Sequence, residues 1–392
     1  MRSRGGNGVR FAALLVTGGV IGQLAQANAA GVIRASGSIL ASQSNPSLIV
    51  PVAVFGSDDR TVLPPNLKPL RESLGVLFNI RLRTVCTAFC VAHDIIGTAA
   101  HCLYRTKGEK APKFADYWFA RNYDAIRDYS RIAGFNTGTS AQNIIAGSAS
   151  LSTTPPIDAT RDWAFVRLAT PVCSKGVLEV RAMPPEKIIE QSKARHIYQI
   201  SYHKDFKQWQ PAFSQPCAVD RSFSGVSWTT IAADFAAADK LVLHTCDTGG
   251  ASSGSPLLLD TEQGPKVIGI NVGTYVQSRK LMRGGVVSDI SQTEVIANTG
   301  VASIAFAEQL AAFRSARVLA GAGALREMQE RLKRLGHYSG PIDGTYGQAM
   351  RVAIVSFQAQ AKLFETGLAS EDVLSHLRLL TARTDPASPP HQ

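Results

Sequence analysis

The chain has 392 residues, of which 45% are hydrophobic and 18% are charged, and its formal net charge is +11 at pH 7. This is more sequence than one hydrophobic core usually organises, so at least two domains are expected. The composition excludes a chain that is disordered throughout, and no segment has the pattern of a nucleic-acid-binding module, so no nucleic-acid partner is expected.

Residues 1–29 have the pattern of a secretory signal peptide. Three arginines precede an apolar run from Phe11 to about Leu24, and Ala27 and Ala29 form a small-residue cleavage pattern. The alternative is an uncleaved membrane anchor, but the run contains three glycines and a glutamine and is short for a membrane span. We therefore expect an exported protein, periplasmic or extracellular, with no membrane span after cleavage.

The region after a short N-terminal or pro segment (30–53) predicts a mainly β domain over 54–315. From about Phe55 to Ile290, short apolar runs alternate with glycine, proline, aspartate and asparagine, which is typical of many short strands in a barrel or sandwich. The composition then becomes helical, with Phe306, Leu310 and Phe313 at spacings of four and three.

The end of the chain predicts a small helical domain behind a linker. The alanine- and glycine-rich residues 316–324 lack bulky side chains that could dock two domains rigidly. Residues 325–380 then contain three apolar helical patterns, the first ending at Gly336 and the third starting near Ser370. Residues 381–392 are rich in proline and polar residues and are expected to form a disordered tail.

The six cysteines favour disulfides over metal or redox chemistry. An even number in an exported protein is typical of disulfide bonding, and the three-residue gap between Cys86 and Cys90 differs from that of a redox pair. No metal or other cofactor is expected. Six cysteines allow fifteen pairings, so their number alone does not fix the connectivity.

His101 is the candidate general base. It follows Thr98-Ala99-Ala100 at the end of an apolar run and precedes Cys102. A base in nucleophilic catalysis has to hold one ring nitrogen toward the nucleophile and the other toward a carboxylate, and a short turn restrained by a cysteine supplies that restraint.

Asp162 is the candidate carboxylate. It begins the apolar run Trp163–Leu168, where an ionised group is costly to bury unless it has a fixed partner. Orienting an imidazole would supply that partner. A turn aspartate at a strand edge is the alternative explanation, and Asp158 is a nearby competitor.

Ser253 is the candidate nucleophile. It lies in a glycine-rich segment that can form a tight loop whose amides converge on an oxyanion, and an apolar run follows at once. Ser252 and Ser255 are alternatives; Ser253 is preferred because Gly254 follows it and because Ser255-Pro256 begins the next strand.

Together these segments resemble the trypsin/chymotrypsin family, with its chain order of His, Asp and Ser. The closer resemblance is to the bacterial glutamyl-endopeptidase branch, in Phe55–Arg60, in Asp247-Thr248 and in the segment from Ser253 to Pro256. It implies a two-barrel chymotrypsin-like fold, a triad of His101, Asp162 and Ser253, and a disulfide between Cys86 and Cys102 across the histidine loop. Cys217 and Cys246 would then flank the serine loop as a pair, which leaves Cys90 with Cys173.

The resemblance also implies an oxyanion hole made by the amides of Ala251 and Ser253, and a specificity pocket containing Asp247 and Asn271. Two residues depart from the branch: Ala251 stands where the family usually has glycine, and Asn271 stands where glutamate-specific members have histidine. Glutamate specificity is therefore not carried over. Ser252 stands where trypsin-like zymogens have aspartate, which removes their mode of activation.

The helical region resembles the peptidoglycan-binding-like three-helix domain, in Leu325–Leu335, in the turn from Gly340 to Gly347 and in Phe357-Gln358. The resemblance implies peptidoglycan as a partner. Candidate contacts are Tyr338, Asp343 and Tyr346, although packing within the turn explains them at least as well.

These features favour an exported serine endopeptidase with a protein or peptide substrate, held at the cell wall by its last domain. One alternative is a wall-binding protein whose protease domain has lost turnover, which only Ala251 supports. Another is a peptidoglycan hydrolase, which is disfavoured because wall peptide hydrolases more often use zinc or cysteine and no zinc-type His/Glu motif occurs.

Overall fold

The fold is taken from a computed structural model of the chain, whose described residues are 31–35, 53–104, 113–123, 128–207, 210–214, 216–283 and 286–384. The expected signal peptide lies outside these ranges, as do residues 36–52 of the pro segment and residues 385–392 of the tail. Within the described ranges, none of the helices combines the length and the apolar character needed to cross a bilayer.

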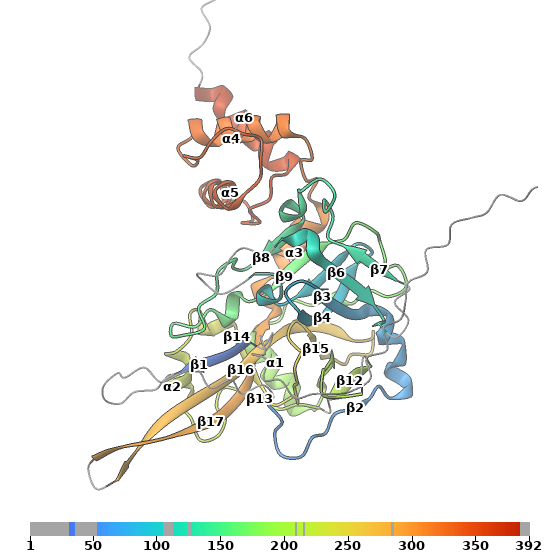
Figure 1. The fold of residues 1–392 in the computed structure, drawn as a ribbon, viewed down its shortest axis with the longest axis vertical. Helices are drawn as coiled ribbons and strands as arrows, with labels where there is room; N and C mark the ends of the chain where they lie inside the picture. The colour runs from blue at the N-terminus through green and yellow to red at the C-terminus, as the bar shows by residue number, and fades with distance from the viewer. Residues whose placement is uncertain are drawn as a thin grey trace, which may run out of the picture.

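An antiparallel sheet of seven strands forms the first part of the β region (Figure 1). Its hydrogen-bonded order is β7-β6-β3-β4-β5-β9-β8. The strands are β3 (Leu74–Asn79), β4 (Thr84–Ala92), β5 (Ile95–Thr98), β6 (Tyr117–Arg121), β7 (Tyr129–Arg131), β8 (Ile144–Ala146) and β9 (Ala164–Arg167).

A second, larger sheet is built around two long strands. Its main order is β13-β14-β17-β16-β15-β11-β12-β2, and β1 and β10 pair in parallel with β16. The strands are β1 (Gly31–Ala35), β2 (Thr61–Val62), β10 (Glu179–Val180), β11 (Ile197–Tyr202), β12 (Pro211–Ser214), β13 (Val219–Asp220), β14 (Leu241–His244), β15 (Pro256–Leu259), β16 (Lys266–Arg283) and β17 (Val286–Ala302).

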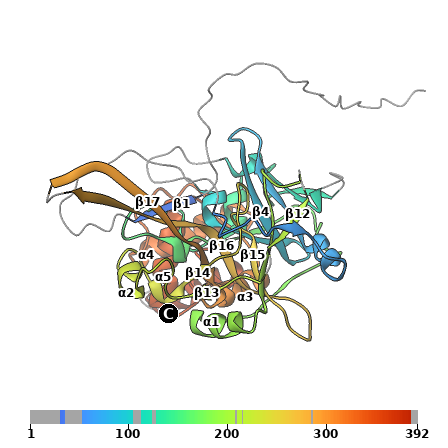
Figure 2. The same ribbon diagram turned by 90° about the horizontal axis from the view of Figure 1, so that it is seen from below.

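The hairpin of β16 and β17 is longer than the short strands that the sequence predicts. The two strands pair from Gly269 with Ala302 to Arg283 with Val286, and Figure 2 shows them reaching away from the body of the protein. Polar residues interrupt the apolar pattern at 277–280 and at the residues 291–294 that pair with them, so the sequence predicts shorter strands here. Backbone hydrogen bonds between the two strands continue the ribbon across these residues.

One hydrophobic cluster joins the two sheets and includes the helix that follows them. It contains Phe89 and Phe165 from the first sheet and Tyr275 from the second. Phe306, just before α3 (Ala307–Ser315), packs on Phe165 with ring centroids 5.5 Å apart. Two further helices, α1 (Pro185–Lys193) and α2 (Trp228–Ala232), lie within connections of the second sheet.

The last three helices form a domain with its own core. They are α4 (Ala322–Arg334), α5 (Gln348–Gln360) and α6 (Glu371–Thr384). Gly336 ends α4 with a φ of +79°, a backbone conformation that glycine adopts at little cost. Met328, Ile354 and Leu377 meet in the core. The expected fold class, mainly β with a small three-helix domain after it, is confirmed.

Two expected segments differ at their ends. α4 begins inside the expected linker. Leu319, also expected in the linker, is buried in the core of the helical domain, and its amide bonds to the carbonyl of Ala369. Thr381, expected to begin the tail, is fully buried in α6, where its hydroxyl donates to the carbonyl of Leu377. The hydrophobic pattern alone therefore places the start of α4 too late and the end of α6 too early, because the residues added at these two ends are small or polar.

Candidate active site

The register of two neighbouring strands brings His101 and Asp162 together. β5 and β9 are antiparallel and pair Thr98 with Ala164, so the residues after β5 lie beside those before β9. His101 is in a 3₁₀ turn, Ala100–Cys102, and Asp162 directly follows another, Ala159–Arg161. Residues 61 positions apart thereby become neighbours.

The Asp162 carboxylate fixes both the backbone and the ring of His101. One oxygen accepts the backbone N–H of His101 at 2.9 Å, and the other lies 2.6 Å from the ring Nδ1. The side chain of Asp162 is only 8% exposed, so the carboxylate is held by this partner and not by water. The competitor Asp158 faces elsewhere, accepting the amide of Ser152 at 3.2 Å.

Covalent bonds hold the histidine turn and its surroundings. The Cys86–Cys102 disulfide ties the turn to β4, and the Cys90–Cys173 disulfide ties the same strand to the segment after β9. A third bond, Cys217–Cys246, lies before the serine loop. These are the three expected pairs. His101 also lies close to the sulfurs of the first disulfide, but their use in the S–S bond removes them as metal ligands.

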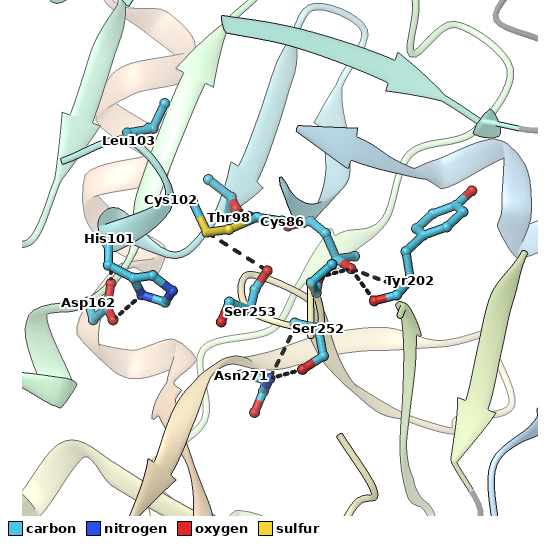
Figure 3. Close-up of a disulfide and its surroundings, with 12 residues drawn as sticks. Cys86, Thr98, His101, Cys102, Leu103, Asp162, Tyr202, Ser252, Ser253 and Asn271 are labelled. Atoms are coloured by element: carbon cyan, nitrogen blue, oxygen red, sulfur yellow. Dashed lines mark hydrogen bonds and ion pairs between the residues drawn. A yellow bond between two sulfur atoms is a disulfide. The ribbon is translucent and has the colours of Figure 1, made fainter. Parts of the chain in front are cut away.

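Ser253 lies on a loop of the second sheet that is fastened to the first. Its carbonyl accepts the amide of Thr87 in β4 at 3.0 Å, and the amide of Gly254 donates to the carbonyl of Asn271 at 2.8 Å. Figure 3 shows the His101 ring between Asp162 and Ser253, with the nitrogen that does not contact Asp162 on the side of Ser253. The three candidates are therefore gathered in one place, from two sheets.

The other two serines of the loop have different partners. The Ser255 hydroxyl accepts from the Gln199 side chain at 2.5 Å. The Ser252 hydroxyl lies 3.4 Å from the Asn271 amide nitrogen (Figure 3). The geometry therefore separates Ser253, the serine beside His101, from its neighbours.

Ala251 adopts the backbone conformation that glycine usually supplies. Its φ is +81°, in the left-handed region, which costs a residue with a Cβ about 1 kcal/mol. The Thr87 hydroxyl donates to its carbonyl at 2.8 Å and so helps to hold the peptide in this orientation. Alanine therefore retains the loop shape, with local strain. Its role and that of Ser253 as oxyanion donors stay predictions.

Gly254 marks where the two sheets come closest at the site. Its φ is +83°, and a Cβ there would lie 2.2 Å from the Thr98 hydroxyl and 2.4 Å from the Thr87 carbonyl. No side chain fits in that space. The glycine after Ser253 is thus required by the approach of the serine loop to β4 and β5.

The two expected pocket residues both have partners inside the protein. Asp247 is buried, and its two oxygens accept the amides of Phe55 and Asp59 at 2.8 and 2.9 Å, which fastens the N-terminal segment beside the serine loop. Asn271 links that loop to His244, whose Nε2 lies 3.1 Å from the Asn271 side-chain oxygen. Their place in a specificity pocket stays a prediction.

The expected wall contacts of the helical domain lie in its internal turn. The hydroxyl of Tyr338 donates to the carbonyl of Pro341, and that of Tyr346 to the carbonyl of Gly367. Asp343 accepts from Gln329 and from the amide of Thr345, and these bonds lower the pKa of its carboxyl to about 2. Each residue thus has a structural role, and contact with peptidoglycan stays a prediction for all three.

Sequence reasoning missed Thr87 and His244. Thr87 is fully buried, and its hydroxyl bonds two other segments: it donates to the carbonyl of Ala251 and accepts the amide of Tyr202 at 2.9 Å. His244 is buried within β14, and burial lowers the pKa of its imidazole to about 4, so that it stays neutral at pH 7. Neither residue has a sequence signal of its own, because both lie inside ordinary strand patterns.

Comparison with known proteins assigns a family to the helical domain and gives only a structural similarity for the larger part of the chain. Residues 322–377 match the family described as a putative peptidoglycan binding domain. No curated protein matches the chain. Among solved structures, one titled "Structure of Glu endopeptidase in complex with MPD" is similar over 66% of this chain and 98% of that chain, with 16% identity and a TM-score of 0.39. The helical domain is thus a peptidoglycan-binding-type domain behind a β region with two sheets.

Proposed function

We propose that this protein is an exported serine endopeptidase that acts at or near the cell wall. The observation that supports it most is the pairing of Asp162 with Nδ1 of His101, with the other ring nitrogen on the side of Ser253 (Figure 3). Three polar side chains from distant segments in this order are the parts of a nucleophilic triad.

In this mechanism, the Ser253 hydroxyl oxygen attacks the carbonyl carbon of the scissile peptide, and Nε2 of His101 takes up the hydroxyl proton. Asp162 keeps the second ring proton on Nδ1 and stabilises the imidazolium that forms. The amides of Ala251 and Ser253 stabilise the oxyanion. The imidazolium then gives its proton to the departing amine. Water, deprotonated by His101, attacks the acyl carbon, and the imidazolium returns that proton to the Ser253 oxygen as the acid product leaves.

The C-terminal domain supports a location at peptidoglycan. Its residues 322–377 match the family of that name, and its fold has a core separate from that of the β region. The predicted signal peptide and the three disulfides favour an oxidising compartment outside the cytoplasm. Co-sedimentation of the full chain with purified peptidoglycan tests this part, and a chain ending at Arg317 should fail to sediment.

Single serine variants test the chemistry. Ser253→Ala should lower kcat on a peptide substrate by several orders of magnitude, and adding His101→Ala should lower it no further because the triad acts as a unit. Ser252→Ala is the matched control and should keep most of the activity. Loss of turnover in Ser252→Ala with retention in Ser253→Ala would move the nucleophile, whereas a wild-type protein without turnover would favour a wall-binding protein that has lost catalysis.

A further inference from the structure

The helical domain is docked on the β region, contrary to the independence that its linker predicts. Leu368 is buried in the hydrophobic cluster of the β region, and Arg351 makes hydrogen bonds to that region. Arg351 lies in α5, which Figure 1 shows on the side of the helical domain that faces the β region. Its guanidinium donates to the carbonyls of Ile144 and Ala146, each at 3.2 Å. These two bonds do not involve the glycine- and alanine-rich linker, so the composition of the linker could not predict them.

The two carbonyls belong to an edge strand of the described sheet. β8 is the last strand in the order of the seven-stranded sheet, and among the described residues it pairs with β9 alone. Carbonyls two residues apart on an edge strand point the same way, so Ile144 and Ala146 present a matched pair of acceptors. The planar guanidinium fork fits two such acceptors, which a lysine ammonium cannot bridge in the same way.

The edge strand leads directly to the catalytic carboxylate. β8 pairs Ala146 with Ala164, and the amide of Gly147 donates to the carbonyl of Trp163 at 3.0 Å. Trp163 follows Asp162. The arginine therefore holds the strand that supports the residues next to Asp162.

The same guanidinium also reaches the histidine turn. Its charge also interacts with the side chains of Tyr104 and Tyr346. Tyr104 is three residues after His101, and its amide donates to the carbonyl of Ala100 at 2.8 Å, within the turn that carries the histidine. Burial raises the pKa of both tyrosines, which places neutral hydroxyls beside the arginine.

The helical domain is shaped to hold the arginine in this position. Tyr346 is fixed by its bond to the Gly367 carbonyl at 2.6 Å. Gly367 packs so closely on the arginine stem that a Cβ there would lie 2.9 Å from Cγ of Arg351. One side chain of the helical domain thus contacts the strand that pairs beside Asp162 and interacts with Tyr104, three residues after His101.

We propose that Arg351 is a positioning residue for the triad: by binding the β8 edge and lying beside Tyr104, it makes the geometry of His101 and Asp162 depend on the docked helical domain. This inference rests on the proposed peptidase function. It adds that the peptidoglycan-binding-type domain takes part in catalysis as well as in location. A ligand that favours the docked arrangement would by the same linkage favour the active geometry.

Arginine variants in the full chain test the proposal, with a peptide substrate short enough to avoid the helical domain. Arg351→Ala should lower kcat about tenfold and leave KM nearly unchanged, because misplacing catalytic groups slows the chemistry more than it weakens substrate binding. Millimolar guanidinium should restore part of the rate. Arg351→Lys should have a kcat as low as that of Arg351→Ala, because lysine keeps the positive charge but lacks the planar guanidinium that binds two carbonyls.

Arg378→Ala is the matched control. Arg378 also makes two short bonds, to Glu327 at 2.8 and 2.7 Å, but both stay within the helical domain. Its kcat should equal that of the wild type. An equal fall in both variants without rescue by guanidinium would reduce Arg351 to a stabilising residue and overturn the proposal.

Fluorophosphonate labelling of the wild-type protein separates this proposal from the one on which it rests. Wild-type protein that labels at Ser253, together with an unchanged kcat for Arg351→Ala, rejects the positioning role and leaves the peptidase function standing. Wild-type protein that neither labels nor hydrolyses peptides rejects the peptidase function and the positioning role with it.

Discussion

The two sides of the candidate site are held by different kinds of interaction. On the histidine side, the Cys86–Cys102 disulfide and the double contact with Asp162 fix His101. On the serine side, the loop depends on hydrogen bonds from distant segments, and Ala251 holds a strained conformation. The comparison teaches that substitutions on the first side should act mainly on the chemistry, and those on the second mainly on loop stability.

The largest effect should come from Asp162→Asn on the histidine side. An amide cannot stabilise the imidazolium and favours the wrong ring tautomer, so kcat should fall by about 10³- to 10⁴-fold. Thermal unfolding, measured in parallel, should show that the fold persists. Asp158→Asn is the control and should hydrolyse peptides at close to the wild-type rate; an equal loss there would break the assignment of the carboxylate.

Asp247→Ala should have the largest effect on stability on the serine side. It leaves the amides of Phe55 and Asp59 without their buried acceptor, so the free energy of unfolding should fall by about 3 kcal/mol in urea titrations. The exposed Asp239→Ala is the control and should change it little. A variant with unchanged stability and an altered substrate preference would instead place Asp247 in the specificity pocket.

The pH dependence of stability should reveal His244. Its folded pKa of about 4 lies below the ordinary value of 6.5, so the unfolded chain binds the proton more readily between these values, and stability falls as the pH drops through this window. Between pH 7.5 and pH 5, the wild type should lose on the order of 2 kcal/mol more than His244→Gln. Parallel losses would mean that His244 is not kept neutral beside Asn271.

Ala251→Gly should give the smallest change and the opposite sign. Glycine removes the cost of a Cβ at a φ of +81°, so the free energy of unfolding should rise by about 1 kcal/mol. Ala311→Gly, at an exposed position inside α3, should lower it by about as much. If both changes destabilise, the strain attributed to the serine side is absent.

The sequence predicted what depends on local pattern and failed where contacts join distant segments. Short apolar runs predicted the mainly β fold, and the three apolar helical patterns of residues 325–380 predicted the last three helices. The surroundings of His101, Asp162 and Ser253 identified side chains that the structure places together. Thr87 and Arg351 escaped prediction because their roles are set by backbone groups of other segments, which leave no mark in the neighbouring sequence.

The outer half of the β16–β17 ribbon was missed for a related reason. Its strands are paired by backbone hydrogen bonds across polar residues that interrupt the apolar pattern, whereas sequence patterns report mainly the burial of side chains. The use of Asp247 is similar. Its resemblance to a pocket aspartate is a property of the sequence, but its bonds to Phe55 and Asp59 depend on where the N-terminal segment folds.

The most direct test of the central claim is to locate the site of covalent labelling. Wild-type protein treated with a fluorophosphonate should carry one adduct, on the peptide that contains Ser253, and His101→Ala should suppress the labelling because the hydroxyl loses its base. Mass spectrometry that finds the adduct on Ser253 in the wild type and none in Ser253→Ala is the predicted result. An adduct on Ser252 or Ser255, or labelling that survives His101→Ala at the wild-type rate, would contradict the triad.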